Sequence, residues 1–292
     1  MKIAAIGEAM IELSMAGDKA DVRVAGDTLN TAIYLKRCAP DLQVDYITRV
    51  GTDAFSDRIL ETMQAEDIGT EAIERDPGGM PGLYAITTDA EGERSFSYWR
   101  DTSAARMVFV TPDGPNFSAL EPYDVIYTSA ITLAIMPAST RAALIRWLQA
   151  FRKSGGRVAF DSNYRPRLWG DVDAARAAMS AMWVLCDIAL PSIDDEMALT
   201  GETASAVVAR FLGLKRTGAL KRGPDGPLCL QTGTTAAYPA AERVVDTTAA
   251  GDSFNGAYLA SVLTGGPQDD ALRAGHELAR QVIGHRGAIL PR

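Results

Sequence analysis

The chain has 292 residues, is 47% hydrophobic and 23% charged, and carries a net charge of −8. This is the composition of an ordinary globular protein with a large apolar core, and the acidic balance does not suggest nucleic-acid binding. The three cysteines are scattered, which predicts no disulfide framework and indicates a cytoplasmic compartment. We expect no membrane span, because no run of about 18 apolar residues occurs, and no signal peptide, because the first apolar run is too short.

The first third of the chain predicts strands and amphipathic helices in alternation. In chain order, the predicted elements are the strand Lys2–Ile6, the helix Gly26–Cys38, the strand Val44–Val50 and the helix Asp53–Ala65. Two strand-like runs then follow, Leu83–Thr88 and Arg94–Arg100, joined by turn residues at 89–93. This hairpin interrupts the alternation, so we place it in a small separate sheet to which residues 11–25 add strands.

From Asp124 onward the chain repeats strand and helix, which predicts βαβ units and a mostly parallel sheet. The predicted strands are Val125–Thr128, Val158–Phe160, Ile188–Leu190, Gly218–Lys221 and Leu228–Gln231. The predicted helices are Ser139–Ser154, Asp173–Val184, one that starts at Asp195–Gly201, Ser253–Thr264 and Asp269–Ile283. With no linker or repeat, we expect one α/β domain over residues 1–292.

The most informative stretch reads Asp-Thr-Thr-Ala-Ala-Gly-Asp-Ser-Phe-Asn-Gly from Asp246 onward. A β-prone Val244-Val245 precedes it, so the pattern predicts a strand, a turn and a helix start, which together offer backbone N–H groups to an anion. Asp252 stands where the helix begins, and its carboxylate can reach an atom that the loop holds. Transfer of a phosphoryl group to an alcohol requires this combination. Alone, the pattern also fits an ordinary helix start capped by Asp252.

This stretch resembles the second signature of the ribokinase-like sugar kinases of the phosphofructokinase-B (PfkB) type, Asp-Thr-x-Gly-Ala-Gly-Asp. Its variant is similar to that of the 2-keto-3-deoxygluconate kinases of that family. The resemblance implies that Asp252 is the general base and that the backbone of Ala249, Ala250 and Gly251 forms an anion hole. Ala249 replaces the first glycine, and alanine tolerates positive φ poorly. We therefore expect residue 249 at negative φ or a slightly remodelled turn.

A second segment, Ala25-Gly26-Asp27-Thr28-Leu29-Asn30, resembles the first signature of the family, Gly-Gly-x-x-x-Asn, with Ala25 in place of the first glycine. By itself it reads as a capped helix. Together with the first resemblance it predicts a sugar site, in which Gly26 lets the sugar approach the backbone and Asp27 and Asn30 bind its hydroxyls.

The predicted hairpin carries Tyr84, Tyr98, Trp99 and Arg100. Tyr98 and Arg100 are two residues apart and should share one face of a strand, while Trp99 takes the other face and packs. The segment resembles the lid of 2-keto-3-deoxygluconate kinases, which implies that Tyr84, Tyr98 and Arg100 contact the substrate.

The segment Asp161-Ser162-Asn163-Tyr164-Arg165-Pro166-Arg167 follows a predicted strand, at the carboxyl end where α/β sheets bind ligands. An arginine can hold a carboxylate or phosphate through two parallel hydrogen bonds. The resemblance places Asn163 on the nucleotide and metal side and Arg165 on the sugar carboxylate or the transferring phosphoryl group. The arginines favour an acidic sugar over fructose or ribose.

Two further segments are assigned to ATP and Mg²⁺ by the same resemblance. Glu196 is the metal-side candidate, although its segment reads equally as an acidic helix start, and Mg²⁺ needs few protein ligands. The loop from Lys221 to Gly226 is predicted to be a tight hairpin turn beside ATP, with Lys221, Gly223, Asp225 and Gly226 as contacts.

The sequence therefore predicts a ribokinase-like α/β fold, a doubly wound, mostly parallel sheet flanked by helices, with a small β-sheet lid from residues 11–25 and 83–100. The predicted function is ATP-dependent phosphorylation of the terminal hydroxyl of 2-keto-3-deoxygluconate. The alternatives are a neutral-sugar kinase and a sugar-binding module without catalysis. A monovalent cation, the gluconate or galactonate epimer, and a homodimer through exposed lid edges stay open.

Overall fold

The computed structural model describes residues 1–88 and 94–292. Its centre is a seven-stranded sheet with the strand order β15-β14-β13-β12-β11-β1-β4. All neighbouring strands run parallel except β14 and β15, which are antiparallel. The strands are β1 (Lys2–Ile6), β4 (Gln43–Ile47), β11 (Val125–Ser129), β12 (Arg157–Asp161), β13 (Ile188–Leu190), β14 (Thr217–Leu220) and β15 (Leu228–Cys229). The predicted mostly parallel sheet is confirmed.

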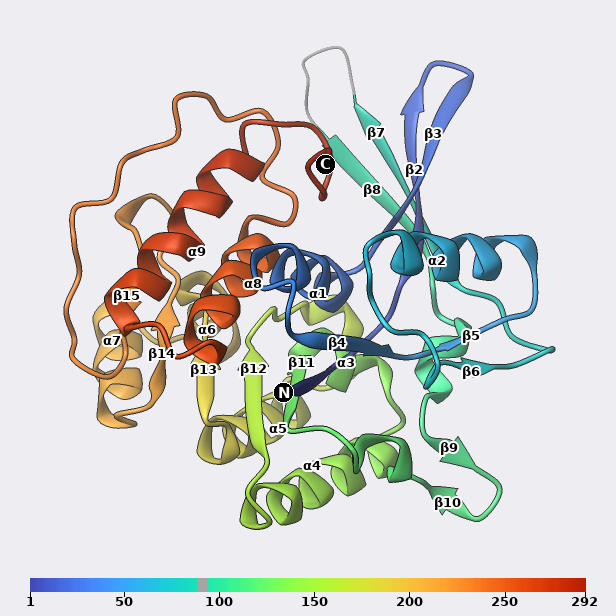
Figure 1. Cartoon of the computed structure of the whole chain (residues 1–292), viewed down its shortest axis with the longest axis horizontal. Helices are drawn as coiled ribbons and strands as arrows, with labels where there is room; N and C mark the ends of the chain where they lie inside the picture. The colour runs from blue at the N-terminus through green and yellow to red at the C-terminus, as the bar shows by residue number, and fades with distance from the viewer. Residues whose placement is uncertain (89–93) are drawn as a thin grey trace.

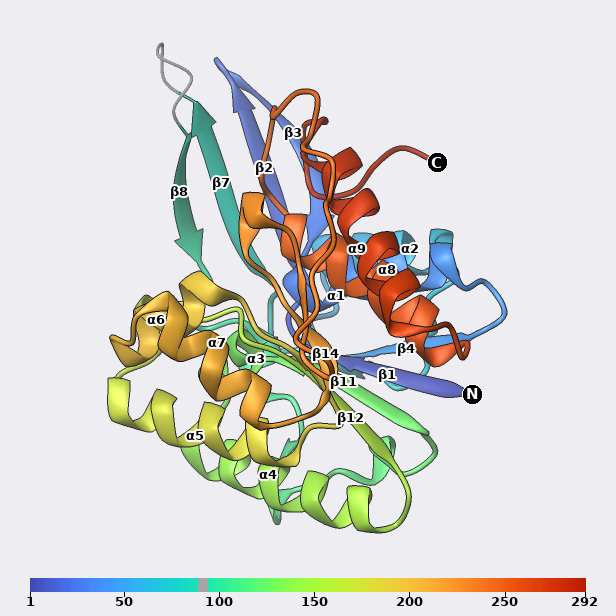
Figure 2. The same ribbon diagram turned by 90° about the vertical axis from the view of Figure 1, so that its left-hand side faces the viewer.

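Helices cover both faces of this sheet (Figure 2). One face carries α1 (Asp27–Cys38), α2 (Ala54–Ala65), α8 (Ala250–Leu263) and α9 (Gln268–Val282). The other carries α3 (Ala130–Ile135), α4 (Ala138–Lys153), α5 (Val172–Leu185), α6 (Ile193–Thr200) and α7 (Ala204–Gly213). Because strand side chains alternate, Ile3 packs into the first layer and Ala4 into the second. Helices α3 and α7 were not predicted from the sequence.

Helices α1 and α8 pack unusually closely. A Cβ atom on Gly256 would lie 2.5 Å from Cβ of Tyr34 and 2.9 Å from the backbone N of Leu35. Only glycine fits at this crossing, and the close approach brings the first turns of the two helices together. These turns carry the two signature segments.

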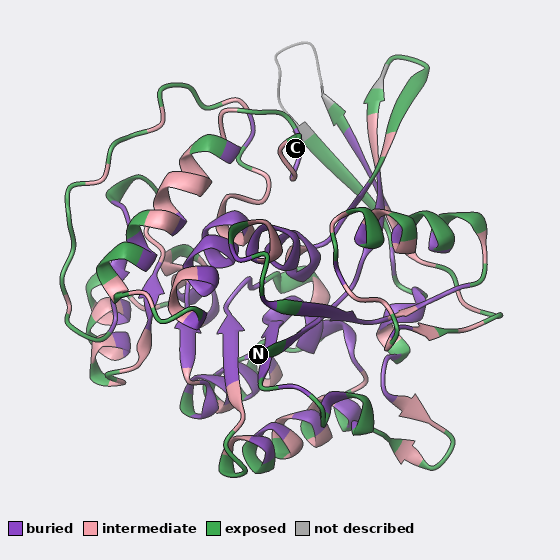
Figure 3. Cartoon of the chain, in the orientation of Figure 1, coloured by how far each residue is buried: buried purple, intermediate pink, exposed green. Residues whose placement is uncertain are grey.

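The four lid strands form a separate sheet with the order β3-β2-β7-β8. They are β2 (Met10–Ala16), β3 (Lys19–Ala25), β7 (Gly82–Thr88) and β8 (Arg94–Trp99), so the predicted lid segments do form one sheet. The predicted turn at 89–93 lies outside the described residues. The sheet projects beyond the core and is more exposed than the central sheet (Figures 1 and 3).

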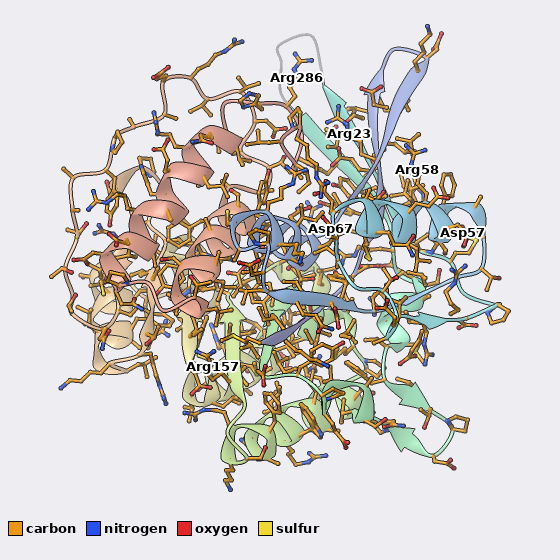
Figure 4. All side chains as sticks on the ribbon, in the orientation of Figure 1. Arg23, Asp57, Arg58, Asp67, Arg157 and Arg286 are labelled. Atoms are coloured by element: carbon orange, nitrogen blue, oxygen red, sulfur yellow. The ribbon has the colours of Figure 1, made fainter. Side chains whose placement is uncertain are left out.

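Helix α2 braces one edge of the lid sheet. Nη2 of Arg58 donates a hydrogen bond of 2.6 Å to the carbonyl oxygen of Val22 on β3. Figure 4 labels Arg58 and Arg23 at this edge, and Arg157 far away at the amino end of β12. The lid is thus tied to the helical layer at β3, whereas β8 is the opposite, outer strand of the sheet.

Several short elements complete the described chain. They are the pair β5 (Arg49–Val50) and β6 (Glu74–Arg75), the pair β9 (Val110–Thr111) and β10 (Gly114–Pro115), and the 3₁₀ helices η1 (Ala104–Met107), η2 (Ser118–Leu120), η3 (Pro166–Leu168) and η4 (Gly223–Asp225). None of the helices in the described ranges has the length and apolar character needed to cross a bilayer.

Candidate active site

Polar side chains gather at the carboxyl edge of the central sheet, as expected for an open α/β fold. Ser129 ends β11 and Asp161 ends β12, and the two residues are paired in register. Lys221 follows β14 directly, and its ammonium group donates to Oδ1 of Asp161 at 2.6 Å. The first turn of α8, with Asp252, meets this group of residues from above the strand ends.

Asp252 is held by the other signature segment. Nδ2 of Asn30 donates to Oδ2 of Asp252 at 2.8 Å, and the Thr31 hydroxyl donates to the Asp252 carbonyl oxygen at 3.2 Å. Burial, together with the charge of Asp27, raises the pKa of Asp252 to about 8, and the Asn30 hydrogen bond opposes the rise. An oriented carboxylate with such a pKa is suited to accept a proton from an alcohol near neutral pH.

The turn before α8 departs from one expectation. Ala249, the N-cap residue, lies in the left-handed region with φ 61° and ψ 16°, so the family turn is kept although the residue is alanine. This conformation costs about 1 kcal/mol or more for a residue with a Cβ atom. The expectation of negative φ is therefore wrong.

The first turn of α8 has the features of an anion site. No side chain caps its N-terminus. The N–H of Ala250 donates to the Thr247 carbonyl oxygen, and the N–H groups of Gly251 and Asp252 are available to a ligand. A Cβ atom on Gly251 would meet only Nζ of Lys221 within 4 Å, at 3.8 Å, among the described non-neighbouring atoms. The helix N-terminus and a lysine ammonium group thus face the same space.

Asp246 fixes the approach to this turn. Its carboxylate accepts from the backbone N–H of Thr248 at 3.0 Å and of Gly287 at 2.7 Å. The predicted strand at Val244–Val245 does not form. Instead, the N–H of Val245 donates to the carbonyl oxygen of Ile283, which ties the segment to the end of α9.

Lys221 is more deeply involved than the sequence indicated. Besides Asp161, its ammonium group donates to Oδ1 of Asn255 at 3.1 Å, and Nδ2 of Asn255 donates to the Tyr127 hydroxyl at 3.3 Å. Both Asp161 and Asn255 are buried. This network fixes the positive charge of Lys221 beside α8. The sequence predicts Lys221 only as a contact in the ATP loop.

The rest of the 221–226 loop is a 3₁₀ turn between two antiparallel strands, as the predicted hairpin requires. Gly223 and Asp225 are exposed. Gly226 is buried with φ 71°, and a Cβ atom there would lie 2.5 Å from Cδ2 of Tyr238. The structure thus explains Gly226 by its packing against Tyr238.

Asp27 lies at the start of α1, and its Oδ2 accepts from the Ser129 hydroxyl and from Nδ2 of Asn163, the latter at 3.0 Å. Burial raises the pKa of Asp27, the Ser129 hydrogen bond opposes this, and the charge of Asp161 adds to it. Asn163 therefore contacts Asp27 of the predicted sugar segment, and its assignment to the nucleotide and metal side stays a prediction.

Gly26 and Asn30 also have partners within the protein. A Cβ atom on Gly26 would lie 2.2 Å from the carbonyl oxygen of Glu8, so the fold itself requires glycine there. Oδ1 of Asn30 accepts from the Gly26 N–H at 3.4 Å while its Nδ2 holds Asp252. In this structure Asn30 positions the carboxylate of Asp252.

The inner face of the lid is aromatic. Tyr84 and Tyr98 are directly opposite each other on β7 and β8, with ring centroids 5.7 Å apart, and Phe96 stacks on Tyr98 at 6.4 Å. The Tyr84 hydroxyl donates to the buried Glu12. Tyr98 is 51% exposed and is free to cover a ligand. Trp99, predicted to pack, is 61% exposed.

Both arginines that were predicted to bind an acid, Arg100 and Arg165, have carboxylate partners within the protein. Strand β8 ends at Trp99, and Cβ of Arg100 lies on the side of the sheet toward which a Cβ atom on Gly82 would point, 3.1 Å from that position. Arg100 is buried and paired with Glu8. Nη1 of Arg165 contacts Oδ1 of Asp195 at 3.3 Å, but its side chain is 54% exposed.

Glu196 occupies a different environment from the one predicted. Its Oε1 accepts from Nε1 of Trp183 at 3.1 Å and its Oε2 from Nη2 of Arg210 at 2.9 Å, in the packing between α5, α6 and α7. Burial raises its pKa to about 6, against the effect of Arg210. Both carboxylate oxygens of Glu196 thus have donors within the protein, and its role on the metal side stays a prediction. In residues 1–88 and 94–292, no three His, Cys, Asp or Glu side chains form a metal-binding group.

Some site residues were not singled out from the sequence. They are Glu8, Glu12, Ser129, Asp161 and Asn255. Ser129 and Asp161 could have been found by one rule, since each directly follows a predicted parallel strand. Glu8, Glu12 and Asn255 carry no such signal, because their partners are distant in the sequence.

The chain matches the pfkB family of carbohydrate kinases over residues 1–292. A 2-dehydro-3-deoxygluconokinase of Dickeya dadantii is 46% identical, over 99% of this chain and 96% of that protein. One from Escherichia coli is 42% identical, over 100% and 97%. Among solved structures, a PfkB protein from Polaromonas sp. JS666 has a TM-score of 0.82 and 26% identity, and the match covers 96% of this chain and 94% of that one. The predicted family is confirmed, and the chain belongs to the pfkB family of carbohydrate kinases.

Proposed function

We propose that this kinase transfers the γ-phosphoryl group of ATP to the terminal (6-) hydroxyl of 2-keto-3-deoxygluconate. The observation that carries the proposal is the oriented carboxylate of Asp252 beside the uncapped N-terminus of α8 and the ammonium group of Lys221. The two relatives reported above, which match nearly the whole chain, are named for this sugar acid, and this supports the choice of substrate.

In the proposed reaction, Asp252 accepts the proton of the attacking hydroxyl while Asn30 holds its carboxylate in place. The backbone N–H groups of residues 249–252 stabilise charge on the transferring phosphoryl group. Lys221 adds a fixed positive charge, because Asp161 and Asn255 keep its ammonium group beside this turn.

The nucleotide would lie along the loop with Gly223, Asp225 and Gly226, with its phosphates directed toward α8. Mg²⁺ would neutralise part of the phosphate charge and be held mainly by the phosphates and water, since it needs few protein ligands. The exposed guanidinium of Arg165 can also approach the transferring group. A monovalent-cation requirement is tested by assaying in potassium and in tetramethylammonium salts.

The sugar would lie between the lid and α1, with Gly26 and Asp27 near its hydroxyls. Tyr84 and Tyr98 present aromatic surface, and Arg100 would bind the carboxylate of the sugar acid. Closure of the lid excludes water, which would otherwise accept the phosphoryl group.

A neutral-sugar kinase is the second candidate, and one observation favours it. Arg100 is paired with Glu8 and Arg165 with Asp195, so both arginines already have carboxylate partners. If these pairs persist when substrate binds, the argument for an acidic sugar loses its physical basis.

A coupled ADP-release assay with Mg-ATP distinguishes the two candidates. We would compare 2-keto-3-deoxygluconate, its galactonate epimer, fructose and ribose. We expect kcat/KM for a keto-deoxy acid at least about tenfold above that for either neutral sugar, the effect of one charge-assisted hydrogen bond. A preference for fructose or ribose would reject the acid assignment and retain the kinase.

Two further predictions concern the state of the protein. A homodimer through the outer strand β8 of the lid would cover the exposed side chains of that strand. Light scattering would give the molar mass in solution. The substitution Trp99→Arg, at an exposed position of β8, should dissociate such a dimer. Cytoplasmic location would be tested by fractionation of the source cells.

A further inference from the structure

The base of the lid contains a buried ion pair that the proposed mechanism does not explain. Glu8 lies between β1 of the core and β2 of the lid, and Arg100 follows β8 at the other side of the lid. Nη2 of Arg100 donates to Oε2 of Glu8, and the two side chains are only 6% and 1% exposed. Charges buried this deeply are costly unless they are paired and hydrogen-bonded.

The connections between core and lid converge on Glu8. A Cβ atom on Gly26, between β3 and α1, would lie 2.2 Å from the Glu8 carbonyl oxygen. A Cβ atom on Gly82, the first residue of β7, would lie 2.5 Å from Oε1 of Glu8. Two glycines therefore leave the space that Glu8 occupies. Glu8 itself precedes β2, and its side chain is paired with Arg100, which follows β8. Glu8 therefore lies beside each point at which one of the four lid strands joins the core.

The pair also has unused hydrogen-bonding groups. Nε of Arg100 is buried and has no hydrogen-bond partner within the described residues, whereas the carboxylate of Glu8 also interacts with the hydroxyl of Ser103. A guanidinium group offers five donors in a fixed plane, and the pair with Glu8 uses one of them. A buried donor without an acceptor destabilises the folded protein. A ligand that supplies an acceptor to Arg100 therefore gains binding free energy.

The position of Arg100 relative to the sugar side supports this reading. Burial raises the pKa of Asp27, and the charge of Arg100 opposes that rise, so the two groups act on each other. Asp27 belongs to the segment assigned to the sugar. The guanidinium of Arg100, which is paired with Glu8, thus also acts electrostatically on Asp27.

We propose that Glu8 is a positioning residue for sugar recognition: it fixes the guanidinium of Arg100 at the base of the lid, so that the remaining donors of Arg100 meet the sugar when the lid closes. The inference rests on the proposed function, because it requires Arg100 to contact the substrate. Glu8 itself acts only through Arg100 and does not touch the reacting atoms.

The test is a double-mutant cycle with Glu8→Gln and Arg100→Ala, using the sugar that the wild type phosphorylates best. Glu8→Gln keeps the size of the side chain and removes its charge. We expect it to raise KM for the sugar about tenfold, the effect of weakening a charge-assisted hydrogen bond, with KM for ATP unchanged. Arg100→Ala should raise KM for the sugar at least as much, and the double variant should add little to that.

Glu66→Gln is the matched control, since Glu66 forms a comparable ion pair with Arg37 on the helical side of the core. It should leave KM for the sugar unchanged. Thermal unfolding of each variant separates loss of folded protein, which lowers kcat, from loss of sugar affinity. Calorimetric titration of the sugar gives the same comparison without turnover.

A sugar KM within twofold of wild type in Glu8→Gln, or additive effects in the double variant, would overturn the proposal. The cycle stays informative if the enzyme prefers a neutral sugar, because it is run on whichever sugar is used. In that case the substrate comparison rejects the sugar-acid assignment. The double-mutant cycle still tests the role of Glu8.

Discussion

The two sides of the site are built differently. At the core side, the polar side chains hold one another: Lys221 is bonded to Asp161 and Asn255, and Asn30 is bonded to Asp252. At the lid side, the strand β8 presents largely exposed aromatic side chains, among them Tyr98. The principal fixed charge pair of the lid lies at its base, between Glu8 and Arg100.

This difference separates two tasks. Groups that stabilise a transition state are effective when they are already in place, so the core side is suited to set the rate. An exposed aromatic surface with a charged base is suited to select and cover a sugar. Substitutions at the core side should therefore change kcat, and substitutions at the lid should change KM.

The largest effect is expected for Asp252→Ala. Removing the general base should lower kcat by roughly 10²–10⁴-fold, with little change in the affinity for ATP. Steady-state kinetics and nucleotide titration measure the two quantities. A variant that retained the wild-type kcat would remove Asp252 from its role as the base.

Arg100→Ala should raise KM for the sugar acid by about tenfold or more, and far less for fructose, because a carboxylate partner is lost. It also leaves Glu8 buried without a counter-charge, which destabilises the fold, so its unfolding midpoint must be recorded. Equal changes of KM for acidic and neutral sugars would refute an acid-binding lid.

The pH dependence of kcat/KM should report on Asp252. Its pKa is raised to about 8, so the carboxylate is largely protonated below that pH, and kcat/KM should rise with pH and level off above about 8. The neighbouring charge of Asp27 contributes to the shift. Asp27→Asn should therefore move the rising limb to lower pH, whatever it does to the maximal value. An unmoved limb would mean that another group controls the profile.

The smallest effect is expected at Ala249, whose left-handed backbone is strained for alanine. Ala249→Gly should stabilise the protein by about 0.5–1 kcal/mol, because the relief of strain exceeds the entropy that glycine adds to the unfolded chain. The free energy of unfolding from urea titration checks this, with kcat kept within a few-fold. Destabilisation would show that the turn is not strained.

Much of the fold followed from local patterns. Apolar periodicity predicted the long helices α1, α2, α4 and α5 to within a few residues, and the strand–helix alternation predicted the parallel sheet. Helix α3 was missed because it has only 6 residues and follows β11 directly. Helix α7, with 10 residues, was missed although a separate connection divides it from α6. The predicted strand at Val244–Val245 does not form, and the N–H of Val245 instead donates to the carbonyl oxygen of Ile283 after α9.

The site was predicted less completely, for a physical reason. The Asp252 segment could be recognised because its chemistry lies within a few consecutive residues. The environment of Arg100 could not be predicted, because its partner Glu8 is 92 residues away in the sequence. Ala249 shows a further limit, since tertiary contacts hold a backbone conformation that the residue itself disfavours.

The central claim is that this chain moves a phosphoryl group from ATP to the terminal hydroxyl of a sugar acid. The most direct test is a ³¹P NMR spectrum of the protein incubated with Mg-ATP and 2-keto-3-deoxygluconate. We predict a phosphomonoester signal coupled to the two protons on C6, which is absent when Asp252→Ala replaces the wild type. ADP formed together with inorganic phosphate alone, or no ADP at all, would contradict the claim.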